Sequence, residues 1–281
     1  MSTNKKFDGY LICSDWDGTL SHNVNVSATN INGTATTANK AVVSPENCEA
    51  IKYFQENGGL FTICSGRQYT YLRDYYNYVK PNTAIVSLCG ALIYDDIRDE
   101  KVYEGYVNEP KMPIIDKIIE RPELISIVYA YIGGSLKADV FTAAEYMAHR
   151  EKIESSDLYK IVFITENEEN MAQLVEYANK LDLNGNLLVR SWPLGLEIYS
   201  SRNSKGNAVR LLKEKTGVHT LICVGDYEND IDMIEAADIG YAVGNAVDSV
   251  KRVADRITVD YREHAIAKII YDLDAEISAK Q

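Results

Sequence analysis

Two aspartates separated by a single residue follow a short apolar stretch near the N-terminus. The stretch 10–13 leads directly into Asp15 and Asp17. Once the chain turns at the end of a strand, one carboxylate can attack phosphorus and bind a hard cation, and the other can protonate a leaving oxygen. A calcium loop would need Gly at its sixth position, where this chain has Leu20, so that alternative is excluded. A functionless pair of turn carboxylates is the other alternative, and the apolar strand before the pair disfavours it.

Three further polar segments follow apolar stretches or begin predicted helices. Residues 65–67 combine a hydroxyl with free backbone N–H groups at a helix N-terminus, an arrangement that binds anions. Lys205 stands at the start of a later predicted helix. Residues 225–230 place three carboxylates and an amide in one tight turn, a set of oxygen atoms that suits Mg²⁺ and its ordered waters. Taken singly, these segments are also compatible with a common turn, a surface lysine and a solvated acidic turn.

Short apolar stretches that end in polar turns predict the elements that position these groups. They lie at 10–13, 60–64, 84–88, 220–224 and 239–243. Such stretches are typical of strands buried on both faces of a parallel sheet. Predicted helices alternate with them, so we expect an α/β fold with a doubly wound parallel sheet, a Rossmann-like hydrolase core. All four polar segments then lie at the edge where open α/β sheets bind ligands.

Helix boundaries are marked by residues that favour helix starts and ends. Ser44 is a suitable N-cap, and Pro45 suits the first helical position. Residues 58–59, both Gly, are expected to end that helix. A second helix is expected at 205–215, with Gly217 as its stop.

In the middle of the chain, the predicted strands and helices follow a different order from the rest. We expect an inserted α+β cap domain at 94–192, and a core domain formed by 1–93 and 193–281. Strands and helices alternate irregularly in this insert, and a two-glycine turn separates two of its strands. The predicted strands are 102–107, 126–131, 137–141, 160–164 and 187–191, and the predicted helices are 114–119 and 168–181.

Residues 21–44 are rich in Asn, Thr, Ser and Ala and show no helical period. The simpler interpretation is a mobile surface loop. The alternative is an extended flap at the mouth of the site.

Composition limits the classes of partner. The chain of 281 residues has 29 Lys and Arg against 41 Asp and Glu, a formal net charge of −12. An acidic surface argues against non-specific binding to nucleic acid or anionic lipid. Because no apolar run could span a bilayer and no signal-peptide core is evident, we expect a cytoplasmic protein without a membrane partner.

The five cysteines form no CxxC pair, so neither zinc nor a redox couple is suggested. We expect a monomer or a weak homo-oligomer.

Together the polar segments resemble the haloacid dehalogenase-like superfamily, and within it the Cof-type (subclass IIB) sugar-phosphate phosphatases. Residues 244–246 and 255–258 resemble that family's closing segment. The resemblance covers the core at both ends, whereas the insert is similar only in size and position. The residues that carry it most clearly are Asp15–Thr19, Ser65–Arg67, Lys205, Gly206, Gly225, Asp226, Asn229 and Asp230.

The resemblance implies a Mg²⁺-dependent phosphatase. Asp15 would be the nucleophile that becomes transiently phosphorylated, and Asp17 would be the general acid and base. Mg²⁺ would be held by the side chains of Asp15 and Asp226 and by the backbone carbonyl of Asp17. An anionic nucleophile that faces an anionic phosphate needs such a cation to cancel the repulsion.

The resemblance also implies the groups that hold the transferring phosphoryl group. Ser65, Gly66, Lys205 and Asn229 would bind it. Asp230 would orient Lys205 without contacting the substrate.

The expected substrate is a small phosphorylated metabolite, such as a sugar phosphate, which the enzyme would hydrolyse as a phosphate monoester. A phosphomutase acting on hexose phosphates is one alternative, and a non-catalytic sensor of a phosphorylated ligand is another. The cap domain should decide the substrate and close over the site. Its aromatic residues Tyr129, Tyr131, Tyr146 and Trp192 either stack on a ligand ring or form the core of the cap, and the core role is favoured for most of them.

Two positions depart from the family pattern. Cys89 stands where the family often has Asn in an Asn-Gly-Ala sequence, and a thiol donates hydrogen bonds only weakly, so a shift in specificity is expected there. His264 belongs to the Glu-His-Ala sequence at 263–265, where the family commonly has an acidic residue and Gly. It either faces the site or has a structural role, and the structural role is favoured.

Overall fold

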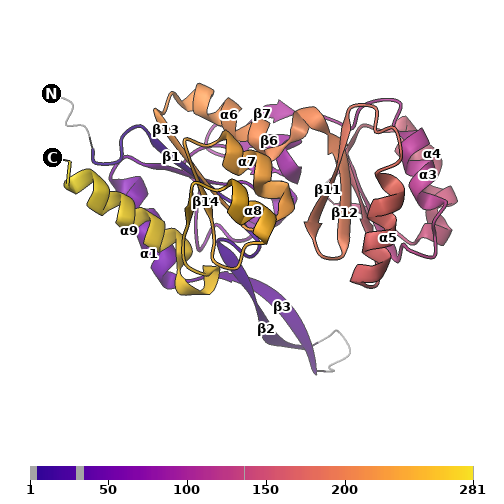
Figure 1. Cartoon of the computed structure of the whole chain (residues 1–281), viewed down its shortest axis with the longest axis horizontal. Coiled ribbons are helices and arrows are strands. Elements are labelled where there is room, and N and C mark those ends of the chain that lie inside the picture. Colours follow the sequence, from indigo (N-terminus) through magenta and orange to yellow (C-terminus); the bar gives the residue numbers. More distant parts are fainter. Residues whose placement is uncertain (1–4, 30–34, 136, 281) are drawn as a thin grey trace.

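A five-stranded parallel sheet forms the centre of the core domain (Figure 1). The computed structural model describes residues 5–29, 35–135 and 137–280. The strand order is β15-β14-β13-β1-β4, and each neighbouring pair is parallel. The predicted α/β fold with a doubly wound parallel sheet is confirmed. The strands are β1 (Tyr10–Ser14), β4 (Leu60–Ile63), β13 (Thr220–Gly225), β14 (Ile239–Ala242) and β15 (Arg256–Ile257).

The apolar stretches form these strands because helices cover both faces of the sheet. In β1, Leu11 and Cys13 pack in one buried cluster with α6, whereas Ile12 between them packs in another cluster with α1 and α9. Since successive side chains point to opposite faces, a strand buried on both sides must be apolar throughout. The helices are α1 (Pro45–Glu56), α6 (Lys205–Thr216), α7 (Ile231–Ala236), α8 (Asp248–Val253) and α9 (Ala265–Ser278).

The predicted helix boundaries are confirmed. The Ser44 hydroxyl accepts a hydrogen bond from the backbone N–H of Asn47 at the start of α1. The Ser204 hydroxyl accepts one from Asn207 at the start of α6. Gly217 ends α6 in the left-handed conformation, with φ of 69°, which glycine adopts without strain.

A small antiparallel sheet continues the core beyond β4. It consists of β5 (Ile85–Ser87), β6 (Leu92–Asp95) and β7 (Glu100–Glu104), and a parallel bridge between Cys64 and Val86 joins it to the edge of the main sheet. The short helix α2 (Tyr69–Arg73) lies in the connection before it. The strand expected at 102–107 was assigned to the cap domain, but β7 pairs with β6 and therefore belongs to the core.

The cap domain contains a separate antiparallel sheet in the order β11-β12-β10-β8-β9. Helices α3 (Met112–Ile119), α4 (Tyr146–Ser155) and α5 (Glu168–Ala178) pack on the face turned away from the core (Figure 1). The strands are β8 (Ile127–Ile132), β9 (Asp139–Phe141), β10 (Leu158–Ile164), β11 (Asn186–Trp192) and β12 (Gly195–Ser200).

The edges of the cap sheet differ from the domain boundaries expected from the sequence. Strand β12 pairs with both β10 and β11, although residues 193–281 were assigned to the core. Strand β12 combines apolar residues with Glu197 and Ser200, and its place in the cap follows from its pairing. We propose that the cap domain begins after β7 and ends with β12.

Residues 21–44 contain a two-stranded antiparallel hairpin, and the interpretation as a surface loop is wrong for its described part. Strands β2 (Ser21–Thr29) and β3 (Ala35–Val43) pair along their whole length, and residues 30–34 of this stretch lie outside the described residues. The hairpin projects from the body of the core domain (Figure 1). A polar, alternating sequence favours a solvated hairpin as much as a loop, which explains the error.

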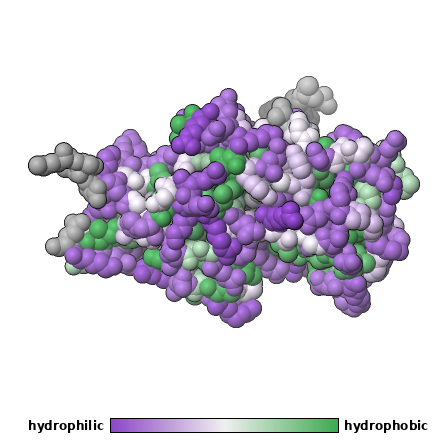
Figure 2. All heavy atoms as spheres, turned by 90° about the horizontal axis from the view of Figure 1, so that it is seen from above, coloured by the Kyte–Doolittle hydropathy of each residue, from purple (hydrophilic) through white to green (hydrophobic). Residues whose placement is uncertain are grey.

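The outer surface is mainly polar. Figure 2 shows one face on which hydrophilic residues predominate and hydrophobic residues are interspersed among them. In the part of the chain that the structure describes, no helix combines the length and the hydropathy needed to cross a membrane.

Candidate active site

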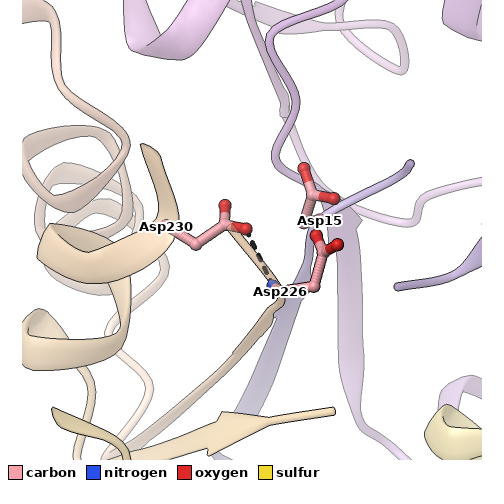
Figure 3. A group of neighbouring side chains, drawn as sticks. All are labelled: Asp15, Asp226 and Asp230. Atoms are coloured by element: carbon pink, nitrogen blue, oxygen red, sulfur yellow. Dashed lines mark hydrogen bonds between the residues drawn. The ribbon is translucent and has the colours of Figure 1, made fainter. Parts of the chain in front are cut away.

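The two strands that carry Asp15 and Asp226 lie side by side where the strand order reverses. From β1 the chain continues to β4 on one side, whereas β13 leads to β14 and β15 on the other. Ligands bind in the crevice at such a switch point. Ser14 pairs with Val224, and the backbone N–H of Asp15 donates to the Val224 carbonyl over 2.9 Å, so both aspartates leave the sheet at the same level. Figure 3 shows their carboxylates next to each other.

A buried lysine connects two of the acidic side chains. The ammonium of Lys205 donates to Oδ1 of Asp15 and to Oδ1 of Asp230, each over 2.6 Å, and Lys205 has no exposed surface. Oδ2 of Asp230 accepts the backbone N–H groups of Asp226 (3.0 Å, Figure 3) and Tyr227 (3.2 Å). Both oxygens of Asp230 are therefore occupied, and its contacts are those of a residue that orients Lys205.

Burial and the neighbouring negative charge raise the pKa values of the other two aspartates. Burial, with the nearby Asp230, raises the pKa of Asp15 to about 7, although Lys205 opposes the rise. Burial, Asp15 and Asp230 raise the pKa of Asp226 to about 9. Burial alone would lower the pKa of Lys205, but the two aspartates that it contacts raise it well above its ordinary value. One lysine thus faces three carboxylates, which leaves the site short of positive charge.

This charge deficit and the donor atoms fit a divalent cation. Carboxylate oxygens of Asp15, Asp226 and Asp230 lie within 4.8 Å of one another. Donors occupy both oxygens of Asp230, whereas Asp15 and Asp226 each keep one oxygen, Oδ2, to which no described residue donates, so these two can act as ligands. Oxygen ligands of this kind suit Mg²⁺. Gly18 has φ of 77°, and a Cβ there would lie only 2.6 Å from Oδ2 of Asp226, so the loop can approach this carboxylate only with glycine.

Asp17 lies in a different environment from Asp15. Its two oxygens accept a bidentate pair of hydrogen bonds from Nε and Nη2 of Arg67, each over 2.8 Å. The Arg67 guanidinium also lies over the ring of Tyr71, 4.8 Å from its centroid. Asp17 remains partly exposed and faces the cavity. The ammonium of Lys205 donates to Asp15 and Asp230 and not to Asp17. The sequence assigned no role to Arg67.

A cavity of about 640 Å³ opens between the core and the cap sheet. The Ser65 hydroxyl, which lines it, accepts the backbone N–H of Arg67 over 3.0 Å. The structure brings almost all the expected site residues to this cavity, with Lys205 and Asp230 directly beneath it. Those that line it are Asp15, Asp17, Ser65, Gly66, Asp226 and Asn229.

The cap sheet covers the cavity with one face. Tyr129, Tyr131, Val162 and Ile164 alternate along β8 and β10 with residues of the cap core, and these four line the cavity. Trp192 at the end of β11 lines it as well.

The fourth cap aromatic, Tyr146, has a structural role. Tyr146 is buried in the cap core, and its hydroxyl donates to Asp116 over 2.5 Å. Tyr146 therefore has the structural position, whereas Tyr129, Tyr131 and Trp192 line the cavity, so the favoured core role is wrong for these three.

Lys160, Glu197 and Asn245 are among the cavity residues to which the sequence assigned no role in the site. Lys160 and Glu197 are charged residues within apolar strands, a signal that could have found them. The Asn245 amide donates to the Gly18 carbonyl over 2.8 Å and so holds the loop after Asp17. The sequence indicated Asn245 only as part of the segment that resembles the family's closing segment.

The two departures from the family pattern have different positions. Cys89 is fully buried and its thiol donates to Glu197 over 3.3 Å. His264 lies instead beside a smaller cavity of about 230 Å³ with Ser44 and Asn47, which favours its structural role.

A family model described as haloacid dehalogenase-like hydrolase matches residues 12–270. The chain belongs to this family. A putative phosphatase of Haemophilus influenzae is 28% identical over 250 residues, which cover 85% of this chain and 94% of that protein. The 5-amino-6-(5-phospho-D-ribitylamino)uracil phosphatase YitU of Bacillus subtilis is 24% identical, over 93% of this chain and 96% of that protein.

Solved structures agree with the fold of this haloacid dehalogenase-like hydrolase. The subclass IIB sugar phosphatase BT4131 superposes with a TM-score of 0.70 at 16% identity, covering 94% of this chain and 99% of that one. The parallel core and the antiparallel cap insert match the fold of the family. The chain is a phosphatase of this family, with a cap domain inserted in its core.

Proposed function

We propose that this phosphatase hydrolyses a small phosphate monoester, such as a sugar phosphate, with Mg²⁺ and through a phosphorylated Asp15. The observation that supports the proposal best is the buried contact of Asp15 with Lys205 beside Asp226, at the floor of a cavity. A nucleophilic carboxylate needs neutralising charge on the phosphoryl group that it attacks, and this arrangement supplies it.

The two aspartates divide the chemistry. A carboxylate oxygen of Asp15 attacks phosphorus while the bond to the leaving oxygen breaks, and Asp17 gives that oxygen its proton. Asp17 then takes a proton from a water that attacks the phosphorus of the aspartyl phosphate, which releases inorganic phosphate and restores both carboxyl groups. The greater exposure of Asp17 and its position on the cavity wall suit a residue that exchanges protons with leaving group and water.

The phosphoryl group would be held by donors around Asp15. Ser65 and Asn229 offer side-chain donors, Gly66 offers a backbone N–H, and Lys205 offers its ammonium. Mg²⁺ bound by Asp15, Asp226 and the Asp17 carbonyl would neutralise phosphate charge. Positioning and charge neutralisation are the main requirements of phosphoryl transfer.

The names of the relatives support a phosphorylated metabolite of sugar or ribityl type. A phosphomutase acting on hexose phosphates would use the same nucleophile, but it would isomerise its substrate and release little phosphate. A non-catalytic sensor would not need Asp15, Asp17, Lys205 and Asp226 together in one site.

The test is the substitution Asp15→Asn. With p-nitrophenyl phosphate and Mg²⁺, we expect wild-type protein to release phosphate and Asp15→Asn to show no turnover while its circular dichroism spectrum stays unchanged. Asp248→Asn, an exposed aspartate at the start of α8, is the matched control and should retain activity. Hydrolysis by Asp15→Asn at the wild-type rate would refute the nucleophile assignment.

A further inference from the structure

A buried cluster of polar groups crosses from the cap to the phosphate-binding segment of the core. Lys160 of β10 donates to the Gly66 carbonyl and to Oε2 of Glu197 on β12, each over 2.8 Å. The Cys89 thiol of the core donates to the same Oε2 over 3.3 Å. The Lys160 ammonium also lies 5.1 Å from the ring centroid of Tyr131. The cluster therefore fixes the cap residues directly above Gly66.

Burying the charges of Lys160 and Glu197 does not by itself stabilise the fold, so the pair is expected to have another role. Lys160 is 2% exposed and Glu197 1% exposed. Removing two charges from water carries a desolvation penalty, and an apolar pair of similar volume is often as stable. Both residues line the cavity. Charges kept at a cavity wall, rather than within the cap core, point to recognition of the ligand.

One oxygen of Glu197 is left for a ligand. Lys160 and Cys89 both donate to Oε2, and no donor among the described residues reaches Oε1. Burial, with the adjacent Glu197 and despite Lys160, raises the pKa of Cys89 to about 12, so the thiol keeps its proton and stays a donor. A Cβ on Gly66 would lie 3.9 Å from Oε1, which places this oxygen next to the phosphate-binding segment.

We propose that Oε1 of Glu197 accepts a hydrogen bond from a hydroxyl of the leaving group, on a carbon close to the phosphate ester, and that Lys160 positions Glu197 for this contact. The inference rests on the proposed function and names its substrate class, the phosphate ester of a polyhydroxylated alcohol such as a sugar or a linear polyol. Cys89 holds the second oxygen of the carboxylate, which gives this departure from the family pattern a role.

The rest of the cavity favours a neutral hydroxyl donor. A second anionic group would meet a wall in which acidic side chains outnumber basic ones. A cationic group would compete with Lys160, which already neutralises Glu197. Tyr129 and Tyr131 stand on the same face of the cap sheet as Lys160 and offer rings to the C–H faces of a carbohydrate. The charged residues of the wall are Asp15, Asp17, Asp226 and Glu197 against Arg67 and Lys160.

The experiment compares two esters that have the same six-carbon chain and differ in hydroxylation. The ratio of kcat/KM for sorbitol 6-phosphate to that for n-hexyl phosphate is measured with Mg²⁺. Partial loss of folded enzyme lowers both values equally, so a purely structural defect leaves the ratio unchanged. The variants are Glu197→Gln, which keeps the shape of the side chain, and the double variant Lys160→Met/Glu197→Leu, which leaves no unpaired buried charge.

We expect wild-type protein to prefer the polyol ester, and the double variant to lower the ratio by about tenfold or more, the value of a hydrogen bond to a charged group. Glu197→Gln should lower it by a smaller factor, and it preserves the test if the double variant does not fold. Asp116→Asn, which breaks an ion pair with Arg150 between α3 and α4, is the control and should keep the wild-type ratio.

Two results would overturn the inference alone: a wild-type enzyme that hydrolyses both esters without preference, or a ratio that Glu197→Gln and the double variant leave unchanged. Hydrolysis of neither ester and of no p-nitrophenyl phosphate would instead overturn the proposed function and this inference with it.

Discussion

At the residue scale, two carboxylates separated by one residue have opposite surroundings. Asp15 is buried against Lys205, whereas Asp17 is paired with Arg67 at the cavity wall. The buried carboxylate keeps a fixed position in contact with a cation, and the exposed one can exchange protons with ligand and water. Different environments can thus assign different roles to two chemically identical groups.

The role of Asp17 predicts a dependence on the leaving group. In Asp17→Asn, kcat for sorbitol 6-phosphate should fall by roughly 10²–10⁴-fold, the usual contribution of general acid-base catalysis. Formation of the phosphorylated enzyme from p-nitrophenyl phosphate should fall much less, because nitrophenolate leaves without a proton. Rapid-quench measurement of the first turnover checks this. An equal loss of first-turnover rate for both esters would contradict the role of Asp17 as the acid.

At the element scale, the start of a helix determines where Lys205, a proposed phosphate-binding residue, lies. Lys205 is the first residue of α6, and the preceding Ser204 caps the helix through Asn207 over 3.2 Å. Ser44 caps α1 through Asn47 over the same distance, but α1 carries none of the proposed catalytic residues. The two caps therefore form a matched pair.

Removing either cap should cost similar stability, but only one removal should affect catalysis. We expect Ser204→Ala and Ser44→Ala each to lower the free energy of unfolding by about 0.5–2 kcal/mol. Only Ser204→Ala should also lower kcat, because the first turn of α6, which positions Lys205, is then less well fixed. Urea denaturation and steady-state kinetics on the folded variants check both statements. A kcat that falls equally in both variants would show that the cap acts only through stability.

The sequence predicted those elements whose signals are local. Strand β1 and the start of α1 follow from an apolar run and from a Ser-Pro pair, and both are confirmed. The placement of β12 could not be predicted, because it depends on pairing with β10, about 30 residues earlier in the chain. The partner of Glu197 was hidden for the same reason, since Lys160 lies on a different strand. Local patterns therefore predict the core strands and the helix starts, whereas contacts between strands require the fold.

At the scale of the whole molecule, the site concentrates negative charge that the fold must tolerate before a cation binds. Asp15 and Asp226 have pKa values of about 7 and about 9 in the folded chain, against 3.8 as the ordinary value. The folded state therefore holds these protons more tightly than the unfolded state does. Their contribution to stability is fully present below about pH 4 and is lost as the pH rises through 7 and 9.

Mg²⁺ should reverse this loss, since it binds only the ionised carboxylates and competes with their protons. We expect the rise in Tm on adding Mg²⁺ to be small at about pH 5 and to become several-fold larger at about pH 8.5, where both carboxylates are more ionised. Thermal melts at both pH values, with and without Mg²⁺, measure it. Asp226→Asn should remove most of the increase at the higher pH, while Asp248→Asn, at an exposed position, should keep it. An equal rise in Tm at both pH values would show that Mg²⁺ binding does not depend on the ionisation of Asp15 and Asp226. The acidic cluster would then not be the metal site.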